Sequence, residues 1–395
     1  MANIRIVPPS GDTTGTADRA AIQAAIDAVS SSINGMVVLS GGQYYINATL
    51  TVNTRATHST TAGVLINGLG MSRIDVASGM TGTYAIEYYG VRGAGCNARI
   101  SGIMLDCNYR CRGILFYYQA YMGLLEDSYI LASNQIGIDA VDCWGSRITG
   151  VVVGYARGIG IRGHRSNQFS LTNCKMYGTG CRSTTSSENA ALWVYDCLNG
   201  RDAAIAYYDG TDGRGTYTED WPAVDDTTVT DGTDAYVRTT AEQRAGVVLA
   251  GNEVGILDLN LEESAYCSYP AIYFSGSNMS AHLIRMETTY NGPAMFIVEG
   301  GTSQGRNVVF TQVHFRNDAL LGAGGKRSVV AARSRSVGLR VADSQLRGFA
   351  GPIIYAETGD HTQASAERLY TMANAIEPAS YLGAAEGATI TADVE

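Results

Sequence analysis

Three carboxylates occupy outward positions of a repeated strand pattern in the second half of the chain: Asp258, Glu262 and Glu287. Two carboxyl groups about 5 Å apart suit a retaining glycosidase, and a separation of about 6.5–9.5 Å suits an inverting one. Carboxylates held this close also raise the pKa of one member of the pair, as a general acid requires. The spacing predicts glycoside hydrolysis, with Glu262 and Glu287 as the acid pair and Asp258 beside them.

Two basic residues are expected beside these acids, because stacked parallel strands lie about 4.8 Å apart. We assign Arg285 and His314 to substrate binding on that basis. The alternative is an ordinary solvated face on which Asp258 and Arg285 form an ion pair. Strand starts at 256, 283 and 310 predict two columns, one of Asp258, Arg285 and Gln312 and one of Asn260, Glu287 and His314.

A second candidate surface is a stripe of aromatic side chains at the outward positions of another strand repeat. Aromatic rings stack on sugar faces, so Trp193 and Tyr195 are predicted to contact a glycan. An exposed stripe is unusual in a soluble monomer, and burial between the subunits of a homotrimer is the competing explanation. The predicted columns are Glu87, Asp139, Trp193, Tyr273 and Phe296, then Tyr89, Tyr117, Arg162 and Tyr195, then Gln119, His164 and Asn252.

Arg162 and His164, next to Asp139, suggest a different reaction. β-Elimination at a uronate needs a base that removes the proton α to the carboxylate and a cation that stabilises the enolate. Spacing alone leaves hydrolysis and elimination both open. A third hypothesis, from another class, is a non-catalytic trimeric spike or adhesin that binds glycan through the aromatic stripe.

The elements that position these residues are short strands repeated along the chain. In one motif the starts at 100, 125, 148 and 171 lie 25, 23 and 23 residues apart. Repeats of this length bury their apolar faces only by stacking, and two strands per repeat indicate an all-β, single-stranded parallel β-helix. Ten segments carry the other motif: Tyr84–Tyr89, Gly113–Tyr118, Gly137–Asp142, Gly158–Gly163, Ala191–Asp196, Gly246–Gly251, Ala271–Gly276, Ala294–Glu299, Ser328–Arg333 and Pro352–Glu357.

The amino-terminal segment predicts a helical cap and a first rung. Thr16 caps a helix over 16–29 on which Ile22, Ile26 and Val29 share one face. An open solenoid end exposes strand edges and core, so an amphipathic helix there acts as a lid.

Gly11-Asp12, the helix with its 21–27 segment, and the strands 35–39 and 42–46 together resemble the amino-terminal signature of pectate-lyase-like right-handed parallel β-helix proteins. That superfamily includes phage tailspikes and capsule depolymerases. The specific motif covers about residues 8–46, and Ser40 stands where proline is frequent in the family. The resemblance implies this fold and a polysaccharide or oligosaccharide as ligand, but it fixes no reaction.

The rung pattern divides the chain into three predicted parts: a cap and first rung over 1–46, the β-helix over 47–358, and a carboxyl-terminal cap or oligomerisation segment over 359–395. A loop insertion over 209–244 interrupts the pattern. Loops of this length are usually functional or disordered. We expect its Tyr217 and Trp221 to help shape the substrate groove.

Composition limits the partners. The net charge of −9 argues against nucleic acid, although a local basic patch can still bind a polyanion. No motif indicates a metal or a cofactor, and no apolar run approaches the roughly 18 residues of a membrane span. The first residues do not form a signal peptide, so we expect cytoplasmic synthesis, with assembly on a phage virion or later release.

Overall fold

The computed structural model divides the chain into two compact units, Met1–Phe169 with Asn199–Trp221 and Ser170–Leu198 with Pro222–Glu395. Each unit is built from rungs of right-handed parallel β-helix, as predicted, since the strands pair in parallel with the strands of the next rung. The structure describes residues 3–30, 35–53, 63–90, 98–119, 123–134, 136–156, 159–177, 205–208, 214–217, 228–231, 234–237, 247–262, 272–287, 294–299, 305–316, 328–333, 335–347, 352–372 and 381–392.

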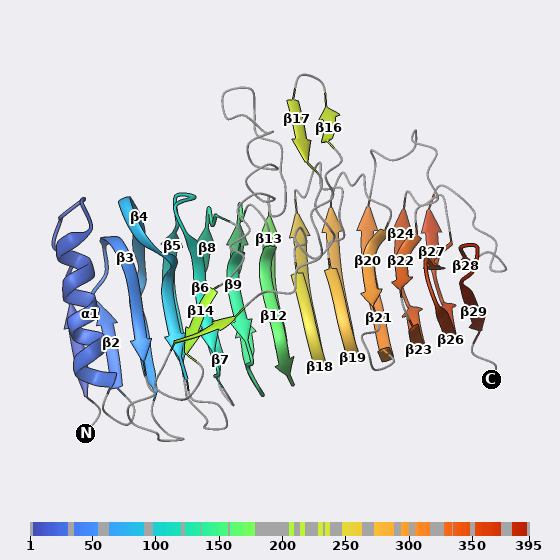
Figure 1. Ribbon diagram of the computed structural model, residues 1–395, viewed down its shortest axis with the longest axis horizontal. Helices are drawn as coiled ribbons and strands as arrows, with labels where there is room; N and C mark the ends of the chain where they lie inside the picture. Colours follow the sequence, from blue (N-terminus) through green and yellow to red (C-terminus); the bar gives the residue numbers. More distant parts are fainter. Residues whose placement is uncertain are drawn as a thin grey trace. The chain divides into compact units, whose positions relative to one another are not determined.

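Helix α1 (Thr16–Ser30), in the described part of the first unit, packs on β2 and β3 (Figure 1). Its strands are β1 (Ile4–Val7), β2 (Gly35–Leu39), β3 (Gln43–Asn53), β4 (Val64–Tyr89), β5 (Arg99–Asp106), β6 (Arg112–Tyr117), β7 (Gly123–Glu126), β8 (Tyr129–Leu131), β9 (Ile136–Val141), β10 (Arg147–Thr149), β11 (Val152–Gly154), β12 (Ile159–Asn167) and the antiparallel hairpin β14 (Ile205–Tyr208) and β15 (Arg214–Tyr217).

Helix α1 covers apolar residues of the first rungs, because its buried face consists of the predicted Ile22, Ile26 and Val29. The helix is capped at its amino end by Asp12, not by Thr16 as predicted. The Asp12 carboxylate accepts the Ala17 N–H at 2.8 Å, and this hydrogen bond holds the pKa of Asp12 below its usual value.

The second unit also consists of parallel rungs. Its strands are β13 (Ser170–Tyr177), β18 (Val247–Glu262), β19 (Ile272–Glu287), β20 (Ala294–Glu299), β21 (Gly305–Arg316), β22 (Ser328–Arg333), β23 (Arg335–Ala342), β24 (Gln345–Arg347), β25 (Ile354–Ala356), β26 (Asp360–Glu367), β27 (Tyr370–Met372), β28 (Leu382–Ala384), β29 (Thr389–Ala392) and, outside the rungs, the antiparallel hairpin β16 (Thr228–Asp231) and β17 (Asp234–Val237).

Two predicted boundaries along the chain are wrong. β13 pairs directly with β18, so the interruption of the rungs begins after Tyr177 and not at 209. At the other end, β26 to β29 pair in parallel with β23, β24, β25 and β26, so the rungs continue to Ala392 and do not stop near 358. The last strands escaped prediction because their side chains are largely exposed and show no apolar alternation. The predicted strand Ala191–Asp196 lies outside the described residues.

Residues of left-handed conformation turn the corners of the rungs. In the second unit the corner positions of successive rungs are in register. A left-handed residue interrupts the alternation of inward and outward side chains along the strand. The corner residues there are Asn173, Asp258, Leu283, Gln312, Asp343 and Arg368, with φ between 49° and 59°.

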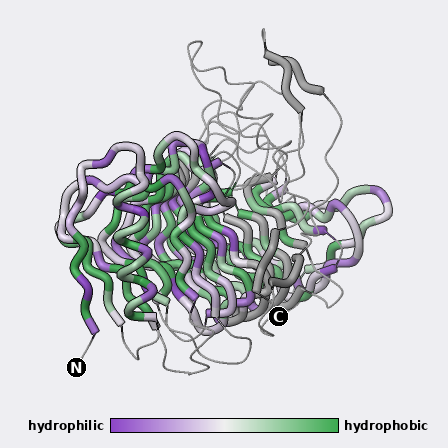
Figure 2. The backbone as a smooth tube through the Cα atoms, turned by 60° about the vertical axis from the view of Figure 1, so that its left-hand side comes forward, coloured by the Kyte–Doolittle hydropathy of each residue, from purple (hydrophilic) through white to green (hydrophobic). Residues whose placement is uncertain are grey.

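Buried serines supply hydrogen-bond partners to backbone groups next to these corners. The Ser344 hydroxyl accepts the Val313 N–H at 3.1 Å and donates to the Ala342 carbonyl at 2.7 Å. Ser128 makes the equivalent bonds in the first unit. Most of the other described buried side chains are apolar, and hydrophobic and hydrophilic stretches alternate along the strands (Figure 2). The described cysteines Cys107, Cys111, Cys143 and Cys174 are buried, and none of these four forms a disulfide.

Candidate functional site

One face of the second unit carries two columns of polar residues at equivalent positions of six strands. The strands are β13, β18, β19, β21, β24 and β27, and each contributes one residue to each column. The first column is Lys175, Asn260, Arg285, His314, Gln345 and Tyr370, and the second, which we call the carboxylate–arginine column, is Tyr177, Glu262, Glu287, Arg316, Arg347 and Met372.

This face points away from the core of the unit. The two residues between the columns whose side chains are described point inward, since Met176 is fully buried and Leu346 is nearly so. The members of the first column whose side chains are described, Lys175 to Gln345, are half-buried or exposed, and the Arg285 side chain is 50% exposed. Residues two apart in a strand share a face, so the carboxylate–arginine column lies on the same outward face.

The two predicted acids are direct register partners. Glu262 of β18 pairs with Glu287 of β19, and Glu287 pairs in turn with Arg316 of β21. The predicted columns did not pair Glu262 with Glu287, because the prediction began the strand at Leu283. In the structure Ala281, two residues earlier, stands opposite Ile256. The structure describes the backbone positions of Glu262 and Glu287, and their side chains lie outside the described part.

Asp258 does not belong to either column. It is a corner residue with φ of 59°, and its carboxylate accepts a hydrogen bond from Arg285 in an ion pair. The alternative prediction of an Asp258–Arg285 ion pair is therefore confirmed. Arg285 itself stands in register between Asn260 and His314, which brings both predicted binding residues to the face that carries the acids.

The predicted aromatic stripe of the first unit is buried, not exposed. Tyr89 and Tyr117 are 1% and 5% exposed, and they pack with Tyr84, Leu115 and Val141. The Tyr89 hydroxyl donates to Glu87 at 2.8 Å. The strands β6 and β9 are buried along their whole length, so both of their faces are covered and the alternation does not indicate exposure.

Phe296, assigned to the same stripe, belongs to the core of the second unit. Its ring stacks on Phe310 with 4.5 Å between the centroids, and it is fully buried. The register pairs Phe296 with Ile272, whereas the prediction paired it with Tyr273. A slip of one residue exchanges the two faces of a strand.

Arg162 lies beside Asp139, as predicted, but the two side chains bind each other. The guanidinium donates through Nε and Nη2 to the two carboxylate oxygens at 2.8 and 2.5 Å, and both side chains are buried. The Tyr84 hydroxyl also donates to Asp139, at 2.5 Å, and accepts from Arg112 at 3.1 Å. Burial alone would raise the pKa of Asp139, but the charge and hydrogen bonds of Arg162 outweigh it and hold that pKa below its usual value.

The remaining predicted binding residues are only partly described. His164 pairs with Val141 through the backbone of β12, and Tyr217 pairs with Ile205 in the β14–β15 hairpin. The side chains of His164 and Tyr217 lie outside the described residues, as do Trp193, Tyr195 and Trp221 entirely.

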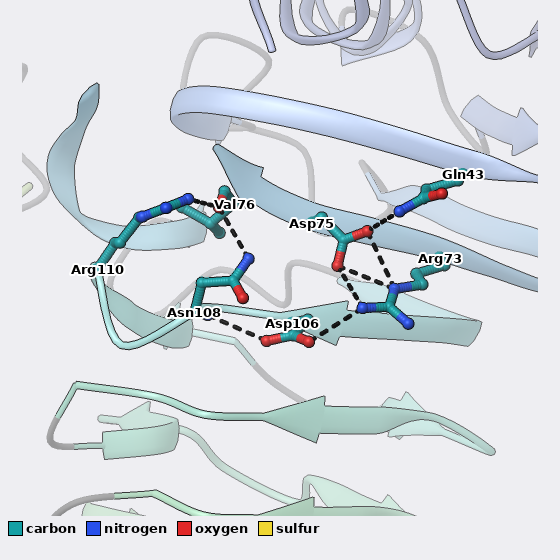
Figure 3. Close-up of polar contacts among 7 residues, drawn as sticks. All are labelled: Gln43, Arg73, Asp75, Val76, Asp106, Asn108 and Arg110. Carbon is teal, nitrogen blue, oxygen red and sulfur yellow. Dashed lines mark hydrogen bonds and ion pairs between the residues drawn. The ribbon is translucent and has the colours of Figure 1, made fainter. Parts of the chain in front are cut away.

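Sequence reasoning missed a polar network on β3, β4 and β5 (Figure 3). Asp75 and Asp106 are register partners, and Arg73 bridges them with distances of 2.9 and 3.2 Å. Gln43 donates to Asp75 at 2.5 Å. The Asp75 hydrogen bond raises the pKa of Arg73, so the two carboxylates share one bound cation and are not a free acid pair. The sequence feature that could have revealed this network is the alternation of apolar residues and aspartates around 75 and 106.

Among the described residues, no group of three or more histidine, cysteine or acidic side chains is arranged to hold a metal ion. In the same part of the chain, none of the helical structure is long and apolar enough to cross a membrane.

No protein-family model and no curated protein sequence matches the chain. Among solved structures it is similar to the A-module of mannuronan C-5 epimerase AlgE6 from Azotobacter vinelandii, at a TM-score of 0.51 and 13% identity over 96% of both chains. It is also similar to the Dettilon tailspike protein gp208, at a TM-score of 0.50 and 12% identity over 93% of this chain and 68% of that one. Geobacillus virus E2 ORF18 aligns at a TM-score of 0.45 and 11% identity over 92% of this chain. This chain spans 58% of the length of ORF18.

At these identities the likeness establishes the fold. The AlgE6 A-module and the Dettilon tailspike support a parallel β-helix over nearly the whole chain. The fold implied by the resemblance of residues 8–46 is therefore confirmed, while the reaction and the substrate are left to the residues of this chain.

Proposed function

We propose that this chain is a carbohydrate-active β-helix protein that cleaves a polysaccharide or oligosaccharide by glycoside hydrolysis. The observation that carries the proposal is the register of Glu262 and Glu287 on adjacent strands of an outward face. Positions so related lie about 4.8 Å apart, which fits the separation of about 5–5.5 Å between the two carboxyl groups of a retaining glycosidase.

The neighbours of the two acids suggest their roles. Glu287 stands next to Arg316, and a nearby cation favours the ionised form of a carboxyl group. Glu287 is then the nucleophile that attacks the anomeric carbon. Glu262, between Tyr177 and Glu287, donates a proton to the leaving oxygen and then deprotonates the water that releases the sugar. Arg285 and His314, in the adjacent column, contact the substrate.

The named neighbours agree with a glycan as ligand. The AlgE6 module is named for mannuronan, and the Dettilon protein is a tailspike. A non-catalytic, homotrimeric glycan-binding spike is the second candidate, favoured by the tailspike likeness. The lyase hypothesis loses support because the Arg162 guanidinium is buried against Asp139 and does not face solvent.

The test is a degradation screen on uronate-containing, neutral and fructan polymers, read by new reducing ends and by ultraviolet absorbance. We expect reducing ends without absorbance, and a loss of at least about 100-fold in Glu262→Gln and Glu287→Gln. Glu386→Gln, in an exposed turn of the same unit, is the matched control. Unchanged turnover in both column variants contradicts the acid pair, absorbance indicates a lyase, and binding without cleavage supports the spike.

A further inference from the structure

Two cysteines flank the turn between β5 and β6 of the first unit. Cys107 directly follows β5, and Cys111 directly precedes β6. The turn is tight, because the Arg110 N–H donates to the Cys107 carbonyl at 2.9 Å. Its central residues, Asn108 and Tyr109, both have left-handed backbone conformation, with φ of 49° and 56°. The first and last Cα atoms of such a four-residue turn lie within about 7 Å, which brings the two cysteines close together.

The two thiols are in contact inside the rung. Cys107 is fully buried, and Cys111 is 3% exposed. A hydrogen bond with the Cys111 side chain and burial both raise the pKa of the Cys107 thiol. The Ser133 hydroxyl donates to Cys107 Sγ at 3.8 Å. Neither cysteine forms a disulfide in this structure, so the turn holds two adjacent thiols.

The same turn is hydrogen-bonded to the rungs on both sides of it. The Asn108 side chain donates to the Val76 carbonyl at 3.0 Å, and the Arg110 guanidinium donates to the same oxygen at 2.5 Å (Figure 3). On the other side the Cys107 N–H donates to the Leu131 carbonyl at 2.9 Å. A covalent link across this turn therefore fixes a point at which hydrogen bonds from three rungs meet.

We propose that Cys107 and Cys111 are a dithiol that closes to a disulfide when the protein meets a small oxidised disulfide such as glutathione disulfide. One cysteine thiolate attacks a sulfur of the oxidant and releases one glutathione thiol, and the other cysteine then displaces the second glutathione. The two cysteines together give up two electrons and two protons, which the oxidant takes up. Thiols persist in reducing compartments and disulfides in oxidising ones, so closure follows transfer of the chain from the first to the second.

Closure requires a brief opening of the turn, because both thiols are buried. Asn108 and Arg110 of the same turn are exposed, so a local opening there brings the thiols to solvent. Thiolate is the attacking species, and the raised pKa of Cys107 leaves little of it at neutral pH. The rate of closure should therefore increase as the pH rises above neutrality.

The test is mass spectrometry of the folded wild-type chain after incubation with glutathione disulfide, labelling of remaining thiols with N-ethylmaleimide in denaturant, and digestion with trypsin. Trypsin cuts after Arg110 and Arg112, so the disulfide joins two peptides, 100–110 and 111–112, that are separate in the reduced protein. We expect this linked pair as the main product, and its loss on treatment with dithiothreitol. Cys143→Ser, which removes another buried cysteine of the same unit, should leave the linked pair unchanged.

The disulfide should also stabilise the chain. The oxidised wild type should unfold at a urea concentration about 0.5–1 M above that of the reduced protein, because the link restricts the unfolded state. Cys111→Ser should show no such shift after the same incubation. The proposal is overturned if Cys107 and Cys111 both carry the maleimide label, are joined only to glutathione, or are joined to other cysteines. An unchanged or lower urea midpoint in the linked protein overturns it as well.

Discussion

Arg162 and Asp139 form a buried, two-point ion pair across adjacent strands of the first unit, with distances of 2.8 and 2.5 Å. Asp139 is fully buried, and Arg162 is 3% exposed. The side chains stand at equivalent positions of β9 and β12. A charge in such a place is tolerated only with its partner, so the pair acts as a structural unit and neither member is available to a substrate.

Replacing Arg162 by methionine should lower the free energy of unfolding at pH 7 by about 3–5 kcal/mol, because it leaves an uncompensated buried carboxylate. The loss should shrink between pH 7 and pH 5. Without the cation, burial raises the pKa of Asp139 above its unfolded value of about 3.9, so protonation then favours the folded state. Urea unfolding at both pH values measures this.

The matched control for that experiment is Arg335→Gln, at an exposed position, which should change stability by no more than about 0.5 kcal/mol. A loss of the same size in the control, or a loss in Arg162→Met that does not depend on pH, contradicts the buried-charge explanation.

His361 should make the second unit more stable at neutral pH than at pH 5. The side chain is buried, with its ring nitrogens bonded to Ser336 Oγ at 2.6 Å and to the Thr358 carbonyl at 2.9 Å. Burial lowers its pKa below the ordinary value of 6.5. The unfolded chain then binds the proton more readily, so this contribution is complete above about pH 6.5 and is lost as the pH falls toward the folded pKa. Unfolding midpoints measured from pH 5 to 8 should show this slope in the wild type, and a smaller one in His361→Asn. An identical slope in both proteins rules His361 out as its source.

The sequence was sufficient to predict the fold, because stacking imposes the same apolar positions on every rung. It did not determine the register. The prediction began this strand at Gly158, but Gly160 is the residue that lies against Gly137. A Cβ atom added at Gly137 would come within 2.6 Å of the Gly160 carbonyl oxygen. The assignment to Gly158 moved Arg162 out of the Asp139 column.

The candidate site shows the same limit in the second unit. Leu283 is apolar, as expected of an inward strand residue, but it occupies the corner, where φ is 55°. Counting from Leu283 instead of Ala281 shifted the predicted columns by two residues and separated Glu262 from Glu287. Local composition carries little information on whether an apolar residue points inward or turns a corner, since that depends on the rungs above and below.

Leu283 should be a position where a single substitution stabilises the protein. Left-handed conformation costs a residue with a Cβ about 1–2 kcal/mol, and asparagine tolerates it better than leucine. The corner position of another rung is already Asn173. Leu283→Asn should therefore raise the free energy of unfolding by about 0.5–1 kcal/mol, measured by chemical denaturation. Leu257→Asn, at an exposed strand position, is the control and should give no gain. Equal effects at both positions would falsify the conformational argument.

Hydrolysis by Glu262 and Glu287 should retain the anomeric configuration of the cleaved sugar. The two residues are register partners in adjacent parallel strands, which places them about 4.8 Å apart. Inverting enzymes hold their carboxyl groups about 6.5–9.5 Å apart to admit a water molecule, a separation larger than the spacing of adjacent strands. Proton NMR of the first product, recorded before mutarotation on the polymer found in the degradation screen, should show retained configuration for the wild type and for Glu386→Gln. An inverted product would mean that a more distant acid takes part, and the search would then move to pairs separated by two rungs.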